Sequence, residues 1–350
     1  MLTFLHAADF HLDSPFHALP PEQAAERRQE QRQLLTRLAD TARQAQVDLV
    51  FLAGDLFDGQ RARPETVQAL YQVLEELEAE VFLSPGNHDP YSPTSPYGKF
   101  PWPDHVHIFT QAAPARVEVP QLGAVVYGSA FTSLYRMDSP LAGFHAQEED
   151  LAAFGCFHGD LSSAHSRYGP ITHNEIAASG LHYLALGHSH SASGLKRAGK
   201  TYYAWPGCPE GRGFDETGDK GVIWGSIDNG QVSLEFVPLA GRRYRIETLD
   251  VSGQDPAQAL AAFLPAQPSP DLCRSTTAMM AKHAAHFKQV GGIEIIGLGS
   301  DFDGIGGKLE LSDCSKMPLL ADALRKEGFT EDEVEAIFFR NAQRFFENNL

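Results

Sequence analysis

Residues 48–58 read DLVFLAGDLFD, an apolar run that ends in a glycine and two aspartates. A short run of this kind is typical of a strand buried on both faces of a sheet. The polar residues that follow it then lie at the carboxyl end of the strand, where open α/β sheets place their binding sites. The stretch therefore predicts a buried strand that delivers Asp55 to such a site.

The same arrangement recurs on both sides of this stretch. Each neighbouring apolar run also ends in polar residues, and segments with a helical pattern separate the first three runs. Alternation of strand and helix predicts an α/β fold with helices flanking the sheet. The expected elements are strands at 2–7, 48–52, 80–83, 154–157 and 183–186, and helices at 22–45 and 64–77.

Five strand ends carry the same kinds of polar side chain. The motifs are D-x-H at 9–11, G-D-x-x-D at 54–58, G-N-H-D at 86–89, a single histidine at 158, and G-H-x-H at 187–190. Carboxylate, amide and imidazole ligands together suit divalent ions such as manganese, iron, zinc or magnesium. Two ions ~3.5–4 Å apart can stabilise both the attacking and the leaving oxygen of a phosphoryl centre. The sequence therefore predicts a two-metal site.

This ordered set of motifs resembles the calcineurin-like metallophosphoesterase superfamily. FLHAADFHLDSPF at 4–16 and PITHNEIAASGLHYLALGHSH at 170–190 are similar to its DNA-repair exonuclease branch, the SbcD-type nuclease subunits. The resemblance covers residues 1 to about 255. It implies a four-layer α/β sandwich, with two mixed β-sheets flanked by helices, and a metal-dependent hydrolase of phosphodiesters, DNA foremost.

Carried over residue by residue, the resemblance implies a role for each motif. The implied ligands are Asp9, His11 and His190 for one ion, Asn87, His158 and His188 for the other, and Asp55 as the bridge. His88 would stabilise or protonate the leaving oxygen, Asp89 would orient its imidazole, and a metal-bound hydroxide would attack. Arg212 is the candidate for a phosphate contact. Manganese is the expected metal, and iron, zinc or magnesium are alternatives.

The end of the chain has a second resemblance. Residues 276–350 resemble the final part of the membrane (renal) dipeptidase family. The stretch HFKQVGGIEIIGLGSDFDGI at 286–305 carries part of this resemblance. In that family the segment closes a (β/α)₈ barrel, and Asp301 would face the substrate. The other ligands of that site are missing, so we favour an Asp-rich loop without a catalytic role. The expected elements are helices at 276–290 and 315–327, a strand at 293–298, and a last helix capped by Thr330 and Glu333.

The chain between these two resemblances changes character twice. The runs TYYAW, GVIWGSI, VSLEFV and YRIETL within 193–250 predict antiparallel strands. A Pro-rich stretch then marks a boundary. We expect a nuclease-like domain at 1–250, a linker at 251–275, and a small α/β appendage at 276–350 that is a partial barrel fragment. In the exonuclease branch this last region docks an SMC-like ATPase. Because this chain departs from that branch after the Pro-rich stretch, an ATPase partner stays open.

Composition narrows the classes of function. A net charge of −17 is unusual for a protein that attracts phosphates broadly, so a nucleic acid would be held locally, by metal ions or a partner. No apolar stretch approaches the ~20 residues of a membrane span. The first residues lack a signal peptide's basic start, and the four cysteines form no C-x-x-C pair. A cytoplasmic protein without membrane contact is expected.

Three alternatives to a DNA exonuclease stay open. The first is a phosphoesterase that acts on nucleotides or other small phosphoesters. The second is a metal-dependent dipeptidase, which the missing ligands disfavour, and the third is a catalytically weak scaffold subunit of a nuclease–ATPase complex. The sequence fixes neither the native metal nor the polarity of digestion, and it does not decide between a monomer and a homodimer.

Overall fold

A computed structural model describes residues 1–17, 19–147, 151–246, 248, 277–293, 316–341 and 343–344. The chain divides into two compact units, residues 1–247 and 248–350, and each is described by itself. Three predictions lie outside the described residues. They are the linker at 251–275, the strand at 293–298 apart from its first residue, and the loop that carries Asp301.

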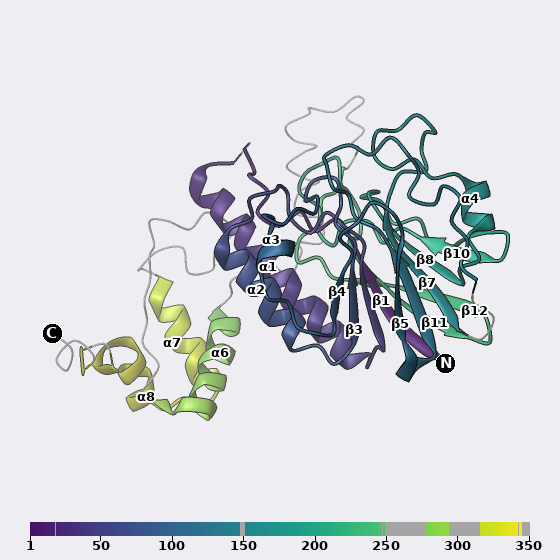
Figure 1. The fold of residues 1–350 in the computed structure, drawn as a ribbon. Helices are drawn as coiled ribbons and strands as arrows, with labels where there is room; N and C mark the ends of the chain where they lie inside the picture. The colour runs from purple at the N-terminus through teal and green to yellow at the C-terminus, as the bar shows by residue number, and fades with distance from the viewer. Residues whose placement is uncertain are drawn as a thin grey trace, which may run out of the picture. The chain divides into compact units, whose positions relative to one another are not determined.

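Two mixed six-stranded sheets form the framework of the described part of residues 1–247 (Figure 1). The first sheet, in spatial order, contains β12 (Gln231–Pro238), β11 (Gly221–Asp228), β1 (Leu2–Ala7), β2 (Leu49–Leu52), β3 (Glu80–Leu83) and β4 (Val106–Ile108). The second contains β5 (Ala115–Val119), β6 (Ala124–Gly128), β7 (Ala152–His158), β8 (Tyr183–Gly187), β10 (Thr201–Ala204) and β9 (Lys196–Ala198). Strands β1 to β4 run parallel, as do β6, β7, β8 and β10. The predicted fold class is confirmed.

Helices cover the outer face of the first sheet (Figure 1). The helical segments in the described part of residues 1–247 are α1 (Pro21–Gln44), α2 (Pro64–Glu75), α3 (Pro96–Lys99), α4 (His173–Ala178) and the 3₁₀ turn η1 (Pro120–Leu122). The helices α1 and α2 cover the first sheet, whereas Ile176 of α4 packs against the second. Leu34 and Leu38, one turn apart on α1, are buried in the same cluster as Val50 of β2. Spacing of four residues puts both leucines on one face of the helix, which explains why α1 packs against the sheet.

An aromatic core fills the space between the two sheets. Residues in β2 alternate: Val50 packs toward the helices, whereas Phe51 packs toward the second sheet. The rings of Phe51 and Phe154 lie 5.5 Å apart, and those of Phe4 and Tyr183 lie 4.5 Å apart. Because successive side chains of a strand point to opposite faces, one apolar run supplies two cores. The sheets are therefore held face to face, with the ends of their parallel strands at a common edge.

The predicted antiparallel region is correct only in part. GVIWGSI and VSLEFV form the antiparallel pair β11 and β12. TYYAW forms β10, which is antiparallel to β9 but runs parallel to β8, because the chain crosses back before β10 begins. Residues 244–246 of YRIETL form no strand. The Tyr244 carbonyl instead accepts a hydrogen bond from Gly218 N at 3.0 Å, and its ring contacts Phe214.

The second unit is helical where the structure describes it. Its segments are α6 (Thr277–Gly291), α7 (Met317–Lys326), α8 (Glu331–Glu335) and the π-helical η5 (Ala336–Arg340). Leu320, Leu324, Phe329 and Ile337 share a buried apolar cluster. Thr330 Oγ1 accepts a hydrogen bond from the backbone N–H at position 333, which confirms the predicted cap. Among the described helices, none is both long and apolar enough to cross a membrane.

His6 is a buried histidine whose proton the fold positions. Its Nε2 lies 3.2 Å from the Leu186 carbonyl and its Nδ1 lies 2.9 Å from the Tyr183 hydroxyl. A carbonyl can only accept, so Nε2 carries the proton and Nδ1 accepts from the hydroxyl. Burial lowers the pKa of His6 from 6.5 to about 3. His6 is therefore a neutral residue of the core.

We expect His6 to make the folded chain sensitive to acid. Below about pH 6.5 the unfolded chain protonates this histidine, whereas the folded chain resists protonation until about pH 3, so the free energy of unfolding falls as the pH falls through this window. The full effect is on the order of a few kcal/mol. Urea unfolding midpoints measured from pH 7 to pH 4 should fall less steeply for His6→Leu than for the natural chain. The exposed His17→Leu is the control, and equal slopes for His6→Leu and the natural chain would contradict the assignment.

Candidate metal centre

The five motifs meet because they follow β1, β2, β3, β7 and β8 at the common edge of the two sheets. Backbone hydrogen bonds align the first two: Asp9 N donates to the Gly54 carbonyl at 3.0 Å and His11 N donates to the Asp55 carbonyl at 2.9 Å. His188 N donates to Asp9 Oδ1 at 3.0 Å, which joins the last motif to the first across the sheets. The predicted convergence of the strand ends therefore holds for motifs almost 180 residues apart.

Close backbone packing explains the glycines that begin these motifs. A Cβ at Gly86 would overlap the Asp55 carboxylate, and a Cβ at Gly187 would overlap the Ala53 carbonyl. A side chain at either position would push two of the strand ends apart. Glycine is needed there because the ligand-bearing loops touch through their backbones.

Four of the predicted ligands have left-handed backbone conformations. The φ angles are 56° at Asp9, 46° at His11, 51° at Asp55 and 101° at His188. Residues other than glycine seldom adopt positive φ, and such strain collects at functional sites. The surrounding fold holds these four residues in conformations that aim their side chains at one point.

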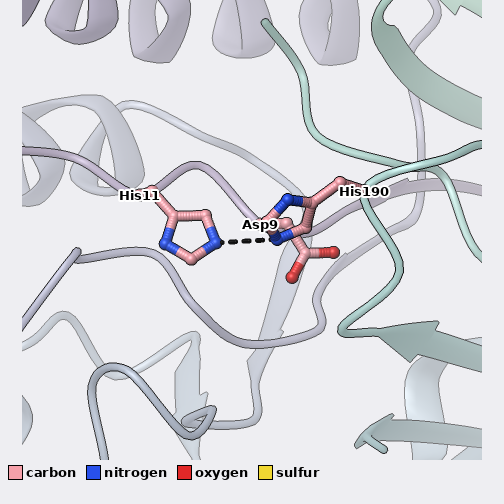
Figure 2. Close-up of side chains that lie close together, drawn as sticks. All are labelled: Asp9, His11 and His190. Atoms are coloured by element: carbon pink, nitrogen blue, oxygen red, sulfur yellow. Dashed lines mark hydrogen bonds between the residues drawn. The ribbon is translucent and has the colours of Figure 1, made fainter. Parts of the chain in front are cut away.

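The first cluster contains Asp9, His11 and His190, whose potential ligand atoms all lie within 4.8 Å of one another. Figure 2 shows the two imidazoles facing each other beside the Asp9 carboxylate; their Nε2 atoms are 3.1 Å apart. His11 Nδ1 lies 2.9 Å from Asp58 Oδ1, and His190 Nδ1 lies 2.6 Å from Glu216 Oε1. Because the carboxylates accept the Nδ1 protons, both Nε2 atoms present lone pairs to each other, an arrangement that fits a cation.

The second cluster is built around the side-chain oxygen of Asn87. This oxygen lies 3.0 Å from His158 Nε2 and 3.2 Å from His188 Nδ1. His158 Nδ1 donates to the Ala53 carbonyl at 2.9 Å, which directs Nε2 into the cluster. An amide oxygen and two imidazoles form a donor set that suits borderline divalent ions.

Asp55 lies between the two clusters. Its Oδ2 is 3.4 Å from His158 Nε2 and 3.8 Å from His11 Nε2, so one carboxylate oxygen faces a histidine of each cluster. Its Oδ1 accepts a hydrogen bond from His88 N at 2.8 Å, which fixes the rotation of the carboxylate. This is the position expected of a bridging ligand, and the six other predicted ligands are gathered around it.

The electrostatics of the centre favour added positive charge. Burial, with a contribution from the charge of Asp55, raises the pKa of Asp9 to about 6. Burial opposes protonation of His158, yet Asp55 and Asp9 raise its pKa to about 9. Burial also lowers the pKa values of His11 and His188 to about 4, which leaves both imidazoles neutral and able to bind a metal. Two buried carboxylates need a compensating cation, so the residues present fit divalent ions.

Asp58, rather than Asp89, lies beside the His88 imidazole. His88 Nδ1 is 3.4 Å from Asp58 Oδ1, the same oxygen that His11 contacts. The contact with Asp58 raises the pKa of His88, whose side chain is 45% exposed. The expectation that Asp89 orients His88 therefore needs correction, because Asp58 occupies the orienting position. The G-D-x-x-D motif already contained Asp58, but sequence could not show which histidines it serves.

Asp89 instead braces the loops that carry the ligands. Its carboxylate accepts hydrogen bonds from the backbone of Asp55 at 3.2 Å, of Phe57 at 3.0 Å and of Gly86 at 2.8 Å, and from the Tyr97 hydroxyl. Burial raises its pKa, with a further contribution from the charge of Asp55. These contacts turn Asp89 away from His88 and join the second motif to the third.

Arg212 and Glu216 form a rim on the His190 side of the centre. Arg212 donates to Glu216 Oε1 at 2.8 Å, and another of its nitrogens lies 3.4 Å from Asp58 Oδ1. Burial alone would raise the pKa of Glu216, but the contacts with His190 and Arg212 hold it well below its ordinary value. Arg212 thus holds the two carboxylates that orient His11 and His190. Sequence reasoning missed Glu216, although its glycine-rich loop, EGRGFDETGDKG, was a usable signal.

The described residues thus combine an α/β sandwich of two sheets with two clusters of potential metal ligands at a common edge of those sheets. Residues 2–192 match the family model described as calcineurin-like phosphoesterase, and the chain belongs to that family. Residues 260–349 match the model described as membrane dipeptidase (peptidase family M19). Both resemblances drawn from the motifs are confirmed as similarities.

Similar curated proteins include one from Bacillus subtilis and one from Methanopyrus kandleri. The chain is 34% identical over 246 residues to the uncharacterized metallophosphoesterase YhaO of Bacillus subtilis, covering 67% of this chain and 60% of YhaO. It is 27% identical over 286 residues to the DNA double-strand break repair protein Mre11 of Methanopyrus kandleri, covering 71% and 59% respectively. The chain thus spans about 60% of the length of these relatives. A dimetal phosphatase from Danio rerio is similar in structure, with a TM-score of 0.42, 11% identity and coverage of 68% of this chain and 96% of that one.

Proposed function

We propose that this chain hydrolyses phosphodiester bonds with the help of two divalent ions, and that DNA is its substrate. The observation that carries the proposal is the position of Asp55, whose Oδ2 faces a histidine of each ligand cluster at 3.4 and 3.8 Å. A single carboxylate between two donor sets supports a paired site, and paired sites suit phosphoryl transfer. Membership of the phosphoesterase family supports the same reaction class.

Asp9, His11 and His190 would hold one ion, Asn87, His158 and His188 the other, and Asp55 both. When bound, such ions polarise phosphoryl oxygens and lower the pKa of water. The mixture of nitrogen and oxygen donors supports manganese, with iron, zinc or magnesium as alternatives. Asp58 and Glu216 accept the Nδ1 protons of His11 and His190, so each imidazole turns its Nε2 toward the ion position.

His88 is the proposed acid of the reaction. Its Nδ1 faces the Asp58 carboxylate and its pKa is raised by that contact, so the imidazole takes up a proton more readily than a free histidine. Its side chain is 45% exposed, whereas that of His11 is fully buried, so His88 can reach a substrate in solution. We infer that its Nε2 proton stabilises or passes to the leaving oxygen. Arg212, beside Asp58 and His190, is the proposed phosphate contact.

DNA is favoured over smaller phosphoesters by the similarity to Mre11, which is named for repair of double-strand breaks. An SMC-like ATPase partner and a homodimer both stay open. The free, buried thiols of Cys156 and Cys208 are compatible with a cytoplasmic setting. The strongly acidic composition is the main argument for the alternative, a phosphoesterase that acts on nucleotides.

An assay of the purified chain with manganese distinguishes these functions. The substrates are linear duplex DNA, a single-stranded oligonucleotide and a small chromogenic phosphodiester. Cleavage of either DNA, lost on addition of EDTA, is the expected result. Cleavage of the chromogenic compound alone would support the small-phosphoester alternative, and no cleavage of any of the three would contradict the proposal.

We predict that Asp301 has no catalytic role. The dipeptidase-like match begins only at residue 260, so the chain lacks most of the barrel that would support such a site. Asp301→Ala should leave both the phosphodiesterase rate and the metal content unchanged. A dipeptide incubated with the zinc-loaded chain should remain intact. Dipeptide cleavage that disappears in Asp301→Ala would make this a chain with two activities.

A further inference from the structure

An exposed aromatic surface lies next to the second ligand cluster. The Tyr168 and His188 rings are 5.2 Å apart between centroids, and the Tyr135 ring is 6.0 Å from that of Tyr168. The guanidinium carbon of Arg167 lies 6.0 Å from the centre of the Tyr135 ring. We call Tyr135, Arg167 and Tyr168 the aromatic step, because its two rings lead outward from the metal centre.

The step is held together by a buried arginine. Arg136, only 8% exposed, donates its backbone N–H to the Arg167 carbonyl at 2.8 Å, and its own carbonyl accepts from Gly169 N at 2.9 Å. One of its guanidinium nitrogens donates to Ser129 Oγ at 3.0 Å. Two separate loops are thereby joined by a short parallel bridge, so the two tyrosines keep a fixed relationship.

The step is also tied to the loop that follows His158. Asp160 N donates to the Gly169 carbonyl at 3.0 Å, and Ile171 N donates to the Asp160 carbonyl at 2.7 Å. These bonds connect the backbone next to Tyr168 to Asp160, two residues after the predicted ligand His158. The aromatic step is therefore fixed in place relative to the second cluster.

The outer part of the step is strongly exposed. Tyr135 is 52% exposed, and its neighbours Leu134 and Met137 are 50% and 67% exposed. Exposed apolar side chains that gather beside a reactive centre indicate a binding surface. The ring of Tyr168 contributes an inner, half-buried face to this surface.

We propose that the aromatic step stacks the base of the nucleotide next to the scissile phosphate. The inference rests on the proposed function and narrows its substrate to a phosphodiester that carries an unpaired base. Aromatic rings and an arginine plane bind bases of any sequence by stacking, and a base in a duplex is already stacked on its neighbours. In a chain with a net charge of −17, Arg167 also supplies positive charge close to the centre. The substrate is thus a single strand or a frayed end.

The test compares two oligonucleotides of equal length and charge, one with ordinary bases and one with abasic residues. The manganese-loaded natural chain should cleave the ordinary strand roughly 10- to 100-fold faster, in kcat/KM, than the abasic strand. Tyr135→Ala and Arg167→Ala should reduce this preference, and Tyr135→Phe should keep it. Arg197→Ala is the matched control, because Arg197 lies 5.0 Å from the Tyr202 ring in the same kind of pair. Its preference should equal that of the natural chain.

Stacking is measured independently by the fluorescence of 2-aminopurine at the terminal position of the strand. The magnesium-loaded His88→Ala chain should quench this fluorescence on binding, and adding Tyr135→Ala should abolish the quenching. Equal cleavage of ordinary and abasic strands, or unchanged quenching without Tyr135, would overturn the inference while leaving phosphodiester hydrolysis intact. If the natural chain cleaves no phosphodiester, the proposed function is wrong. The fluorescence quenching then tests on its own whether the aromatic step stacks a base.

Discussion

Asp55→Asn is expected to abolish phosphodiester hydrolysis and to release at least one metal ion. The substitution keeps the shape of the side chain and the Oδ1 that accepts from His88 N, but it removes the charge that faces both clusters. Removing a residue that only hydrogen-bonds to a metal ligand typically lowers metal affinity or activity by up to ~10²-fold. Losing a ligand shared by two ions should lower them more. The measurements are the initial rate on a phosphodiester and the metal content by elemental analysis.

The matched control is Asp104→Asn, at an exposed aspartate outside the five ligand motifs. It should match the natural chain in rate and metal content. Urea unfolding of Asp55→Asn separates loss of the site from loss of the fold. A folded Asp55→Asn chain that retains two ions and an unchanged rate would show that Asp55 bridges nothing.

His88→Ala is expected to lower the rate by about 10²–10⁴-fold while the metal content stays the same. The imidazole is half exposed and contacts Asp58, whereas His11 presents its Nε2 to His190. His11→Ala should therefore lose metal, and His88→Ala should not. The comparison matters because His11, Asp58 and His88 also lie close enough together to hold an ion. Loss of one ion from His88→Ala would make His88 a ligand instead of an acid.

The convergence of the five motifs could be predicted from sequence because each motif directly follows an apolar run. Strands bring their carboxyl ends to one edge, so local sequence around Asp9, Asp55 and His188 was enough to predict that they converge. The fold class followed from the same pattern, since β1, β2 and β3 alternate with helices. Each of these motifs and elements can be recognised within a short stretch of sequence.

Features that depend on long-range packing could not be predicted. Glu216 reaches His190 only because a glycine-rich loop folds back over 26 residues. Asp89 is adjacent to His88 in sequence, yet the tight turn after β3 aims its carboxylate at the backbone of the neighbouring loop. The parallel direction of β10 depends on how the chain crosses back after His190. In each case the partner is chosen by tertiary contacts, which local sequence does not specify.

The central claim is that two ions share Asp55, and anomalous diffraction from crystals soaked in manganese tests it most directly. The expected result is two peaks ~3.5–4 Å apart, one beside His11 and His190 and the other beside Asn87 and His158, with the Asp55 carboxylate between them. A single peak, or a pair of peaks that Asp55 does not touch, would contradict the two-metal account.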